Sequence, residues 1–117
     1  MITNFEEITC DLTKEEKKII PIVIAKLKKH SVKNPIKSFE IVKFIYKETG
    51  YKLGQPRFRK ICNFIRCNSI IPLIATSRGY YVSKSKAELE KQINSLFERS
   101  DAIVAAASGL YHFIKTK

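Results

Sequence analysis

Apolar residues after the first dozen positions recur at helical spacing. Thr13-Lys-Glu-Glu16 reads as a capping box, in which the Thr13 hydroxyl and the Glu16 carboxylate satisfy each other's backbone donors at the start of a helix. The stripe that follows has spacings of three and four residues and consists of Ile20, Val23, Ile24 and Leu27. Pro21 lies inside this pattern, and its missing N–H predicts a bend in the helix or a break near Ile20.

A second helix is predicted from Ser38, as its N-cap, to Gly50, which can adopt the left-handed conformation that ends a helix. Only residues 51–54 separate it from a third helix that starts near Gln55, where Pro56 suits the first turn. Two helices joined by a short turn with glycine are typical of a helix-turn-helix. The predicted core faces are Ile41, Phe44 and Ile45 in the second helix and Phe58, Ile61, Cys62 and Ile65 in the third.

Two short segments of β character follow. Residues 70–75 are mostly apolar and partly β-branched, with Pro72 inside the run, which predicts an edge strand. Gly79 favours a turn, and residues 80–82 predict the returning strand of a hairpin. The loop before the second helix leaves room for a residue or two of strand at Ile36.

The last third of the chain predicts one long helix. Ser85-Lys-Ala-Glu88 is a second capping box, and Ser108-Gly109 is where a kink or break would fall. The apolar or small positions of this helix follow a heptad pattern: Leu89, Ile93, Leu96, Ser100, Ile103, Ala107, Leu110 and Ile114. Two interpretations fit, a lid over the domain's own core or a dimer coil.

These elements predict a mainly α fold with a small β-hairpin, namely a winged helix-turn-helix followed by a long C-terminal helix. The chain of 117 residues is long enough for one core without disulfides or metal. We expect a flexible acidic arm at residues 1–12, a winged helix-turn-helix domain at 13–84 and the C-terminal helix, as core lid or dimerisation element, at 85–117.

The formal net charge is +11 at pH 7, and its position is more informative than its size. The charge by segment is −3 for residues 1–13, +6 for 14–37, +7 for 38–84 and +1 for 85–117. Positive charge concentrated in the middle of the chain favours a polyanion partner over a merely solubilising role. Arginine is more localised still, because four of the five arginines lie within residues 54–81.

The exposed side of the third helix combines positive charge with an amide. At about 100° per residue, Arg59 and Arg66 share one flank, while Lys60 and Asn63 lie opposite the core face. Arginine can fork onto guanine or phosphate, asparagine can pair with adenine, and lysine neutralises phosphate. A solvated basic face is the common alternative, but the use of arginine favours binding. The candidate DNA-contacting residues are Arg57, Arg59, Lys60, Asn63, Arg66 and, at the hairpin turn, Arg78.

Other classes of protein have weaker support. Three cysteines without a Cys-x-x-Cys pair, and only two histidines, argue against a metal site or a disulfide framework. No catalytic triad pattern or glycine-rich phosphate loop is present, so we expect no catalytic residue and no cofactor, and an enzyme is the least favoured class. No apolar run suits a membrane span, and the acidic N-terminus is unlike a signal peptide, which predicts a cytoplasmic protein without a membrane partner.

Several of these residues also match a known pattern. The segments Phe58-Arg59-x-x-Cys62-x-x-Ile65-Arg66, Ile71-Pro72-Leu73-Ile74 and Gly79-Tyr80-Tyr81, followed by a capped helix, resemble a winged helix-turn-helix family of bacteriophages and mobile elements. The resemblance covers roughly residues 36–104. It implies a small DNA-binding protein of transcription regulation or replication in a bacterial host cell, with Arg59 and Arg66 as paired helix arginines and Gly79 as the wing glycine.

The chain departs from this family at three places. Ala75 stands where a serine is usual, the glycine before the wing strand is replaced around Ser69, and one extra residue precedes Pro72. The entry angle of the wing is the feature that these departures affect.

Two functions follow as expectations. The first is binding of double-stranded DNA through the third helix, with the wing alongside. The second is a winged helix that binds a host protein as an inhibitor or adaptor. It is favoured by the heptad surface and by Ile19 and Ile22, two apolar residues of the first helix that lie outside its stripe. A homodimer through the C-terminal helix or the first helix is a further expectation.

Overall fold

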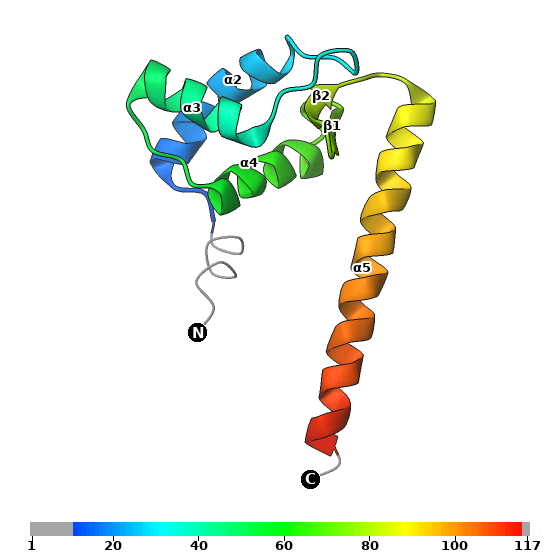
Figure 1. Ribbon diagram of the computed structural model, residues 1–117. Coiled ribbons are helices and arrows are strands. Elements are labelled where there is room, and N and C mark those ends of the chain that lie inside the picture. Colours follow the sequence, from blue (N-terminus) through cyan, green and yellow to red (C-terminus); the bar gives the residue numbers. More distant parts are fainter. Residues whose placement is uncertain (1–10, 116–117) are drawn as a thin grey trace. The chain divides into compact units, whose positions relative to one another are not determined.

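The computed structural model describes residues 11–115, with side chains up to residue 114. Contacts divide the chain between Lys84 and Ser85 into two compact units, and we describe each by itself. The first unit holds α2 (Lys14–Leu27), α3 (Ser38–Thr49), α4 (Gln55–Cys67), β1 (Leu73–Thr76) and β2 (Gly79–Val82), and the second holds α5 (Lys86–Lys115) (Figure 1).

The start of α2 confirms the predicted capping box. The Thr13 backbone N–H donates to Glu16 Oε1 at 2.8 Å, and the Glu16 backbone N–H donates to Thr13 Oγ1 at 3.1 Å. A break near Ile20 is not found, because the helix continues through Pro21 as far as Leu27. Pro21 is exposed, so water can hydrate the carbonyl that lacks its helical N–H partner.

The turn between α3 and α4 follows the prediction closely. Gly50 ends α3 in the left-handed region with a φ of 77°, and α4 begins at Gln55 with Pro56 in its first turn. The N-cap of α3 is Lys37 and not Ser38, because Lys37 has the extended backbone that marks the boundary. The Lys37 backbone N–H donates to the Glu40 carboxylate at 3.2 Å, which satisfies a donor at this helix end.

The first strand of the hairpin begins later in the chain than predicted. β1 and β2 pair antiparallel from Leu73 opposite Val82 to Thr76 opposite Gly79, so Ser77 and Arg78 form the turn. Pro72 lies just before β1 and not inside it, which corrects the prediction of a strand through that residue. Proline has no N–H for a strand ladder, and here the paired segment begins after it.

Ile36 forms an isolated β-bridge with Tyr80 of β2, at the position where the sequence left room for a residue or two of strand. Its N–H donates to Tyr80 O at 2.9 Å, and the Tyr80 N–H donates to Ile36 O at 2.7 Å. Gly79, with a φ of 134°, lies directly beside this bridge, and a Cβ atom there would be 2.6 Å from Ile36 O. Glycine is therefore required by the close approach of two backbones as well as by the turn.

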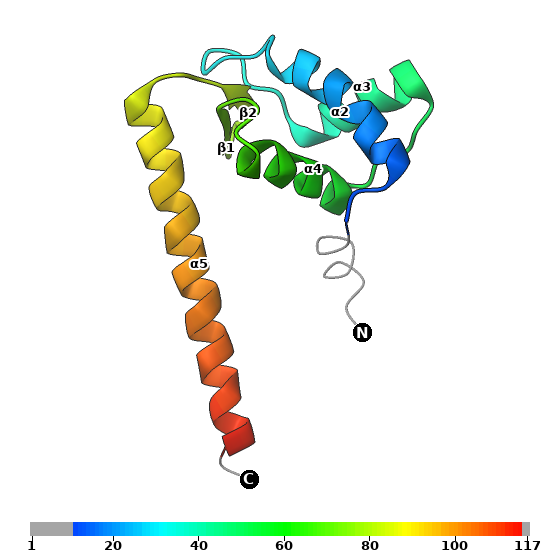
Figure 2. The same cartoon turned by 180° about the vertical axis from the view of Figure 1, so that it is seen from behind.

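One hydrophobic core joins these elements. The predicted core positions Ile41, Ile45, Phe58, Ile61, Cys62 and Ile65 are buried, and Phe44 is partly buried against them. Ile19 is also buried, and Ile22 packs against the core. The elements follow in the order of one helix, the bridge at Ile36, two helices and a two-stranded hairpin. This order confirms the predicted winged helix-turn-helix (Figure 2).

The second unit is a single continuous helix. α5 spans 30 residues without a break at Ser108 or Gly109. At its start the Glu88 backbone N–H donates to Ser85 Oγ at 3.4 Å, which is one of the two hydrogen bonds of the predicted capping box. This helix completes the fold class that the sequence predicts.

Candidate nucleic-acid interface

The solvent face of α4 carries three polar side chains, those of Arg59, Lys60 and Asn63. Arg59 and Asn63 are exposed, and Lys60 is half-buried. Within residues 11–115 none of the three side chains makes a hydrogen bond or an ion pair. A guanidinium, an ammonium and an amide are thus available to a ligand along two turns of one helix.

Arg57 has a different position from the other candidates. Its Nε donates to Glu16 Oε2 at 2.7 Å and its Nη2 donates to Glu16 Oε1 at 2.5 Å, which makes a two-pronged ion pair between α4 and α2. The same Nη2 donates to Asp11 O at 2.9 Å. The side chain of Arg57 is only 15% exposed. We therefore remove Arg57 from the candidate DNA-contacting residues and assign it to the fold.

The carboxylate of Glu16 is the centre of this contact. Its side chain is 2% exposed and accepts from Thr13 as well as from Arg57. The hydrogen bond from Arg57 is the main cause that lowers the pKa of Glu16 below its usual value of 4.5; burial opposes that shift. The pair holds α4 against the first turn of α2 and so fixes the orientation of the α4 solvent face.

Arg66 lies on the opposite flank of α4. It is half-buried, and its Nε donates to Leu73 O on β1 at 3.3 Å. Arg59 shares this flank by helical phase and lies seven residues nearer the start of α4. Arg66 both joins α4 to β1 and keeps part of its surface exposed.

The hairpin turn contributes a separate exposed cation. Arg78 is exposed, and its backbone N–H donates to Thr76 Oγ1 at 3.2 Å, which shapes the turn. Lys37 Nζ donates to Ser77 O at 2.8 Å and so ties the start of α3 to this turn. Sequence reasoning missed Lys37, because nothing in the sequence distinguishes it from the other lysines.

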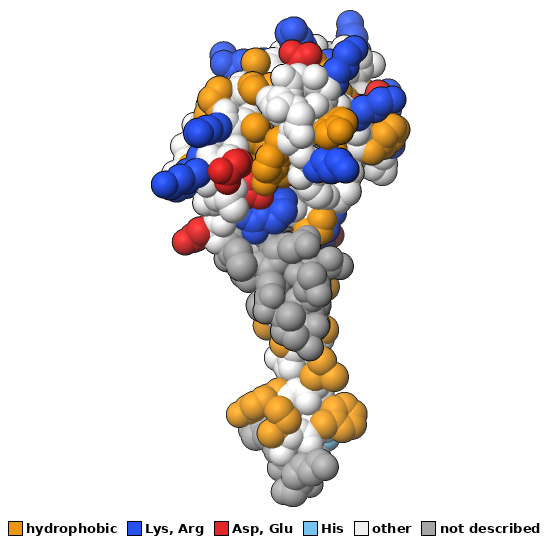
Figure 3. Space-filling view, turned by 90° about the vertical axis from the view of Figure 1, so that its left-hand side faces the viewer, with side chains coloured by type: hydrophobic (Ala, Val, Ile, Leu, Met, Phe, Trp, Pro, Cys, Tyr) orange, Lys and Arg blue, Asp and Glu red, His pale blue; other side chains and the backbone are white. Residues whose placement is uncertain are grey.

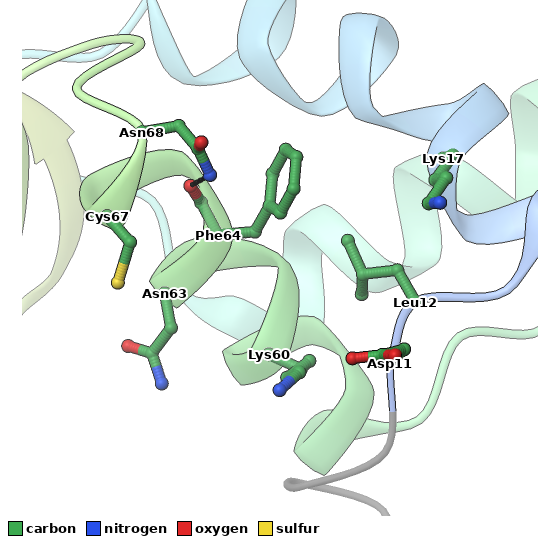
Figure 4. Close-up of a pocket in the computed structure, with 8 residues that line it drawn as sticks. All are labelled: Asp11, Leu12, Lys17, Lys60, Asn63, Phe64, Cys67 and Asn68. Atoms are coloured by element: carbon green, nitrogen blue, oxygen red, sulfur yellow. Dashed lines mark hydrogen bonds between the residues drawn. The ribbon is translucent and has the colours of Figure 1, made fainter.

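An open depression borders the same face of α4. Figure 4 shows Lys60, Asn63 and Cys67 of α4 on one side and Asp11 and Leu12 on the other. Leu12 is buried at 9% exposure, so this part of the predicted arm belongs to the core, whereas residues 1–10 lie outside the described residues. The depression is lined by charged and amide side chains together with the apolar side chains of Leu12 and Phe64.

Basic residues are distributed widely around the first unit. Figure 3 shows lysine and arginine side chains across the face that it draws, with only a few acidic ones among them.

No described helix is long and apolar enough to cross a membrane. In the described part of the chain, no group of three or more His, Cys, Asp or Glu side chains could hold a metal ion.

The thiols of α4 differ in environment. Cys62 is buried beneath the solvent face, and burial raises the pKa of its thiol to about 12. Cys67 is exposed at the end of the helix. Cys62 is therefore a packing residue, as its place on the core face predicts.

Comparison with known proteins adds no relative to this picture. No protein-family model, curated protein sequence or solved structure matches the chain significantly. The resemblance to the winged helix-turn-helix family of bacteriophages and mobile elements therefore stays a prediction.

Proposed function

We propose that this protein binds double-stranded DNA, with α4 in the major groove and the β1–β2 turn against the adjacent backbone. The observation that carries the proposal is the solvent face of α4, where Arg59, Lys60 and Asn63 have no partner within residues 11–115. These are the residue types that read base edges and neutralise phosphate.

Each side chain has a distinct role in the proposal. Arg59 forks onto guanine O6 and N7, and Asn63 pairs with adenine N6 and N7, because both geometries need two parallel hydrogen bonds. Lys60 and the exposed part of Arg66 neutralise phosphate, and Arg78 lies along the backbone beside the groove. The excess of positive charge in residues 14–84 supports this arrangement by steering the protein toward a polyanion.

The test is a titration with a duplex recovered from a random pool, followed by fluorescence anisotropy at several salt concentrations. Arg59→Ala and Asn63→Ala should each weaken binding by about 1 to 3 kcal/mol, or roughly 5- to 150-fold, if they contact bases. Arg78→Ala should weaken binding of all duplexes alike and reduce the salt slope by about 1, because it removes a phosphate contact.

Two matched variants control for charge alone. Arg99→Ala removes an exposed arginine from α5 that is not among the proposed DNA contacts, and should leave the affinity within about twofold, since it lowers the net charge without removing such a contact. Arg59→Lys keeps the charge but loses the fork, and should lose selectivity while it retains non-specific binding. An Arg59→Ala variant that binds the selected duplex as tightly as Arg99→Ala would remove α4 from the interface.

A protein-binding winged helix that acts on a host protein is the second candidate. Of the two helix residues that favoured it, Ile19 is buried in the core of the first unit and Ile22 is partly buried against that core. Its remaining support is exposed apolar surface, which includes Phe39 at 63% and Tyr46 at 50% on α3. Pull-down from host lysate with and without nuclease separates the two, because only a protein partner survives the destruction of nucleic acid.

A further inference from the structure

α5 carries a wide apolar stripe that is exposed to solvent. Along the heptad seam, Ile93 is 48% exposed, Ile103 69% and Leu110 70%. A second line of large side chains, seven residues apart, widens the seam on one side: Phe97, Val104 and Tyr111, at 66%, 60% and 58% exposure. Apolar side chains are visible along the C-terminal half of α5 in Figure 3.

Such a helix needs a packing partner. α5 would be about 45 Å long at 1.5 Å per residue, and residues 102–114 contain no Asp, Glu, Lys or Arg. Most helical stability in proteins comes from packing of the apolar face, and exposed apolar patches of this kind mark interaction surfaces. The sequence of the seam itself indicates what the partner is.

We infer that α5 pairs with α5 of a second copy of this chain, in an antiparallel two-helix coil. The seam alternates spacings of four and three residues from Leu89 to Ile114, which is the heptad pattern that keeps one helix against another along a coiled coil. Two of its positions, Ser100 and Ala107, are small. The residues that face these two positions differ between a parallel and an antiparallel pair, and this difference indicates how the two helices run.

An antiparallel pair matches every small position with a large one. When the symmetry axis passes between Asp101 and Ala102, reversed numbering sets the layers as Leu89 with Ile114, Ile93 with Leu110, Leu96 with Ala107, and Ser100 with Ile103. Large residues opposite small ones fill the layers evenly. A parallel pair would set Ser100 against Ser100 and Ala107 against Ala107, which leaves two underfilled layers and a packing loss at each.

The flanks of the seam agree with the same direction. In the antiparallel pair Phe97 lies beside Val104 of the other copy, and Arg99 lies beside Ala106. Glu90 lies beside Tyr111, so no two like charges face each other across the seam. Opposed helix dipoles also favour the antiparallel direction. This dimer goes beyond the proposed DNA binding and does not depend on it.

Light scattering of the full chain without DNA tests the association. The expected mass is twice 13.5 kDa. Ile103→Asp should weaken the dimer by on the order of 100-fold or more, because both copies lose an apolar contact near the axis. Ile103 is exposed on the isolated helix, so this change should leave the first unit folded. Ala105→Asp places the same charge on the side of α5 away from the seam, about 160° from Ile103 at 100° per residue, and should leave the dimer intact.

Cross-linking tests the direction. In a Cys10→Ser, Cys67→Ser background, Ile93→Cys chains mixed with Leu110→Cys chains should form mixed dimers with a short bis-maleimide, and neither variant alone should cross-link. Buried Cys62 stays out of this reaction because its thiol pKa is about 12. A monomeric wild type, a dimer insensitive to Ile103→Asp, or cross-linking of either single variant alone would overturn the antiparallel pair.

Discussion

The ion pair between Arg57 and Glu16 gives the sharpest prediction about the fold that supports the candidate interface. It joins α4 to the first turn of α2 through two short hydrogen bonds, at 2.7 and 2.5 Å. Glu16 also closes the capping box through Thr13. The perturbation is Glu16→Ala, with Arg57→Ala and the double variant completing a mutant cycle.

The expected magnitude follows from burial. Removing one partner of a buried pair costs about 3 to 5 kcal/mol, because the other charge is left without its partner. Arg57 retains 15% exposure and the contact with Asp11 O, which places the loss from this source near the lower end. Loss of the cap adds about 1 kcal/mol. Glu16→Ala should therefore lower the free energy of unfolding by about 4 kcal/mol.

Urea denaturation of the four proteins measures the coupling. The double variant should be more stable than the sum of the single losses predicts, by about 2 to 3 kcal/mol, since it leaves no unpaired charge. Glu15→Ala with Arg59→Ala is the matched control on the same two helices, because both side chains are exposed, and its coupling should be near zero. A coupling for Glu16 and Arg57 no larger than that of the control would refute this account.

The pH dependence supplies an independent check on the same pair. The folded state holds the pKa of Glu16 below its usual value of 4.5, mainly through the Arg57 hydrogen bond. Its contribution to stability is therefore fully present above about pH 4.5 and is lost as the pH falls through the lower folded-state pKa. Arg57→Ala removes the main cause of the shift, so the loss of stability in acid that Glu16 causes should shrink in that variant.

Two substitutions and one labelling experiment test other parts of the structure. Ser69 has a φ of 52°, in the region that favours glycine, so Ser69→Gly should stabilise the protein by about 1 kcal/mol in urea denaturation. Gly79→Ala should cost about 2 kcal/mol or more, because its Cβ would lie 2.6 Å from Ile36 O; an unchanged midpoint would contradict the close approach. Iodoacetamide at neutral pH should label exposed Cys67 and spare buried Cys62, as read by peptide mass spectrometry, and equal labelling would show that Cys62 is accessible.

Local patterns predicted the elements of the fold because each depends on neighbours in sequence. The capping box at Thr13, the left-handed Gly50 and the core face that starts at Phe58 all follow from spacing along one helix. The strand through Pro72 was wrong because strand pairing depends on a partner that the local sequence does not specify.

The candidate interface was only partly predictable for the same reason. Helical phase places Arg57 and Arg59 on different flanks of α4, but it does not say which flank faces another helix. Glu16, 41 residues away, pairs with Arg57, and Arg59 is left exposed. The bridge between Ile36 and Tyr80 likewise joins distant segments. Extended backbone at Ile36 could be expected from the sequence, but its pairing with Tyr80 could not.

Selection from a random pool of duplexes tests the central proposal most directly. Wild-type protein and an Arg59→Ala, Asn63→Ala double variant should be carried through the same rounds, with Arg99→Ala as the control for charge. If α4 reads base edges, wild type and Arg99→Ala should enrich one common motif, and the double variant should enrich none. Enrichment of the same motif by the double variant, or of no motif by the wild type, would contradict the proposal.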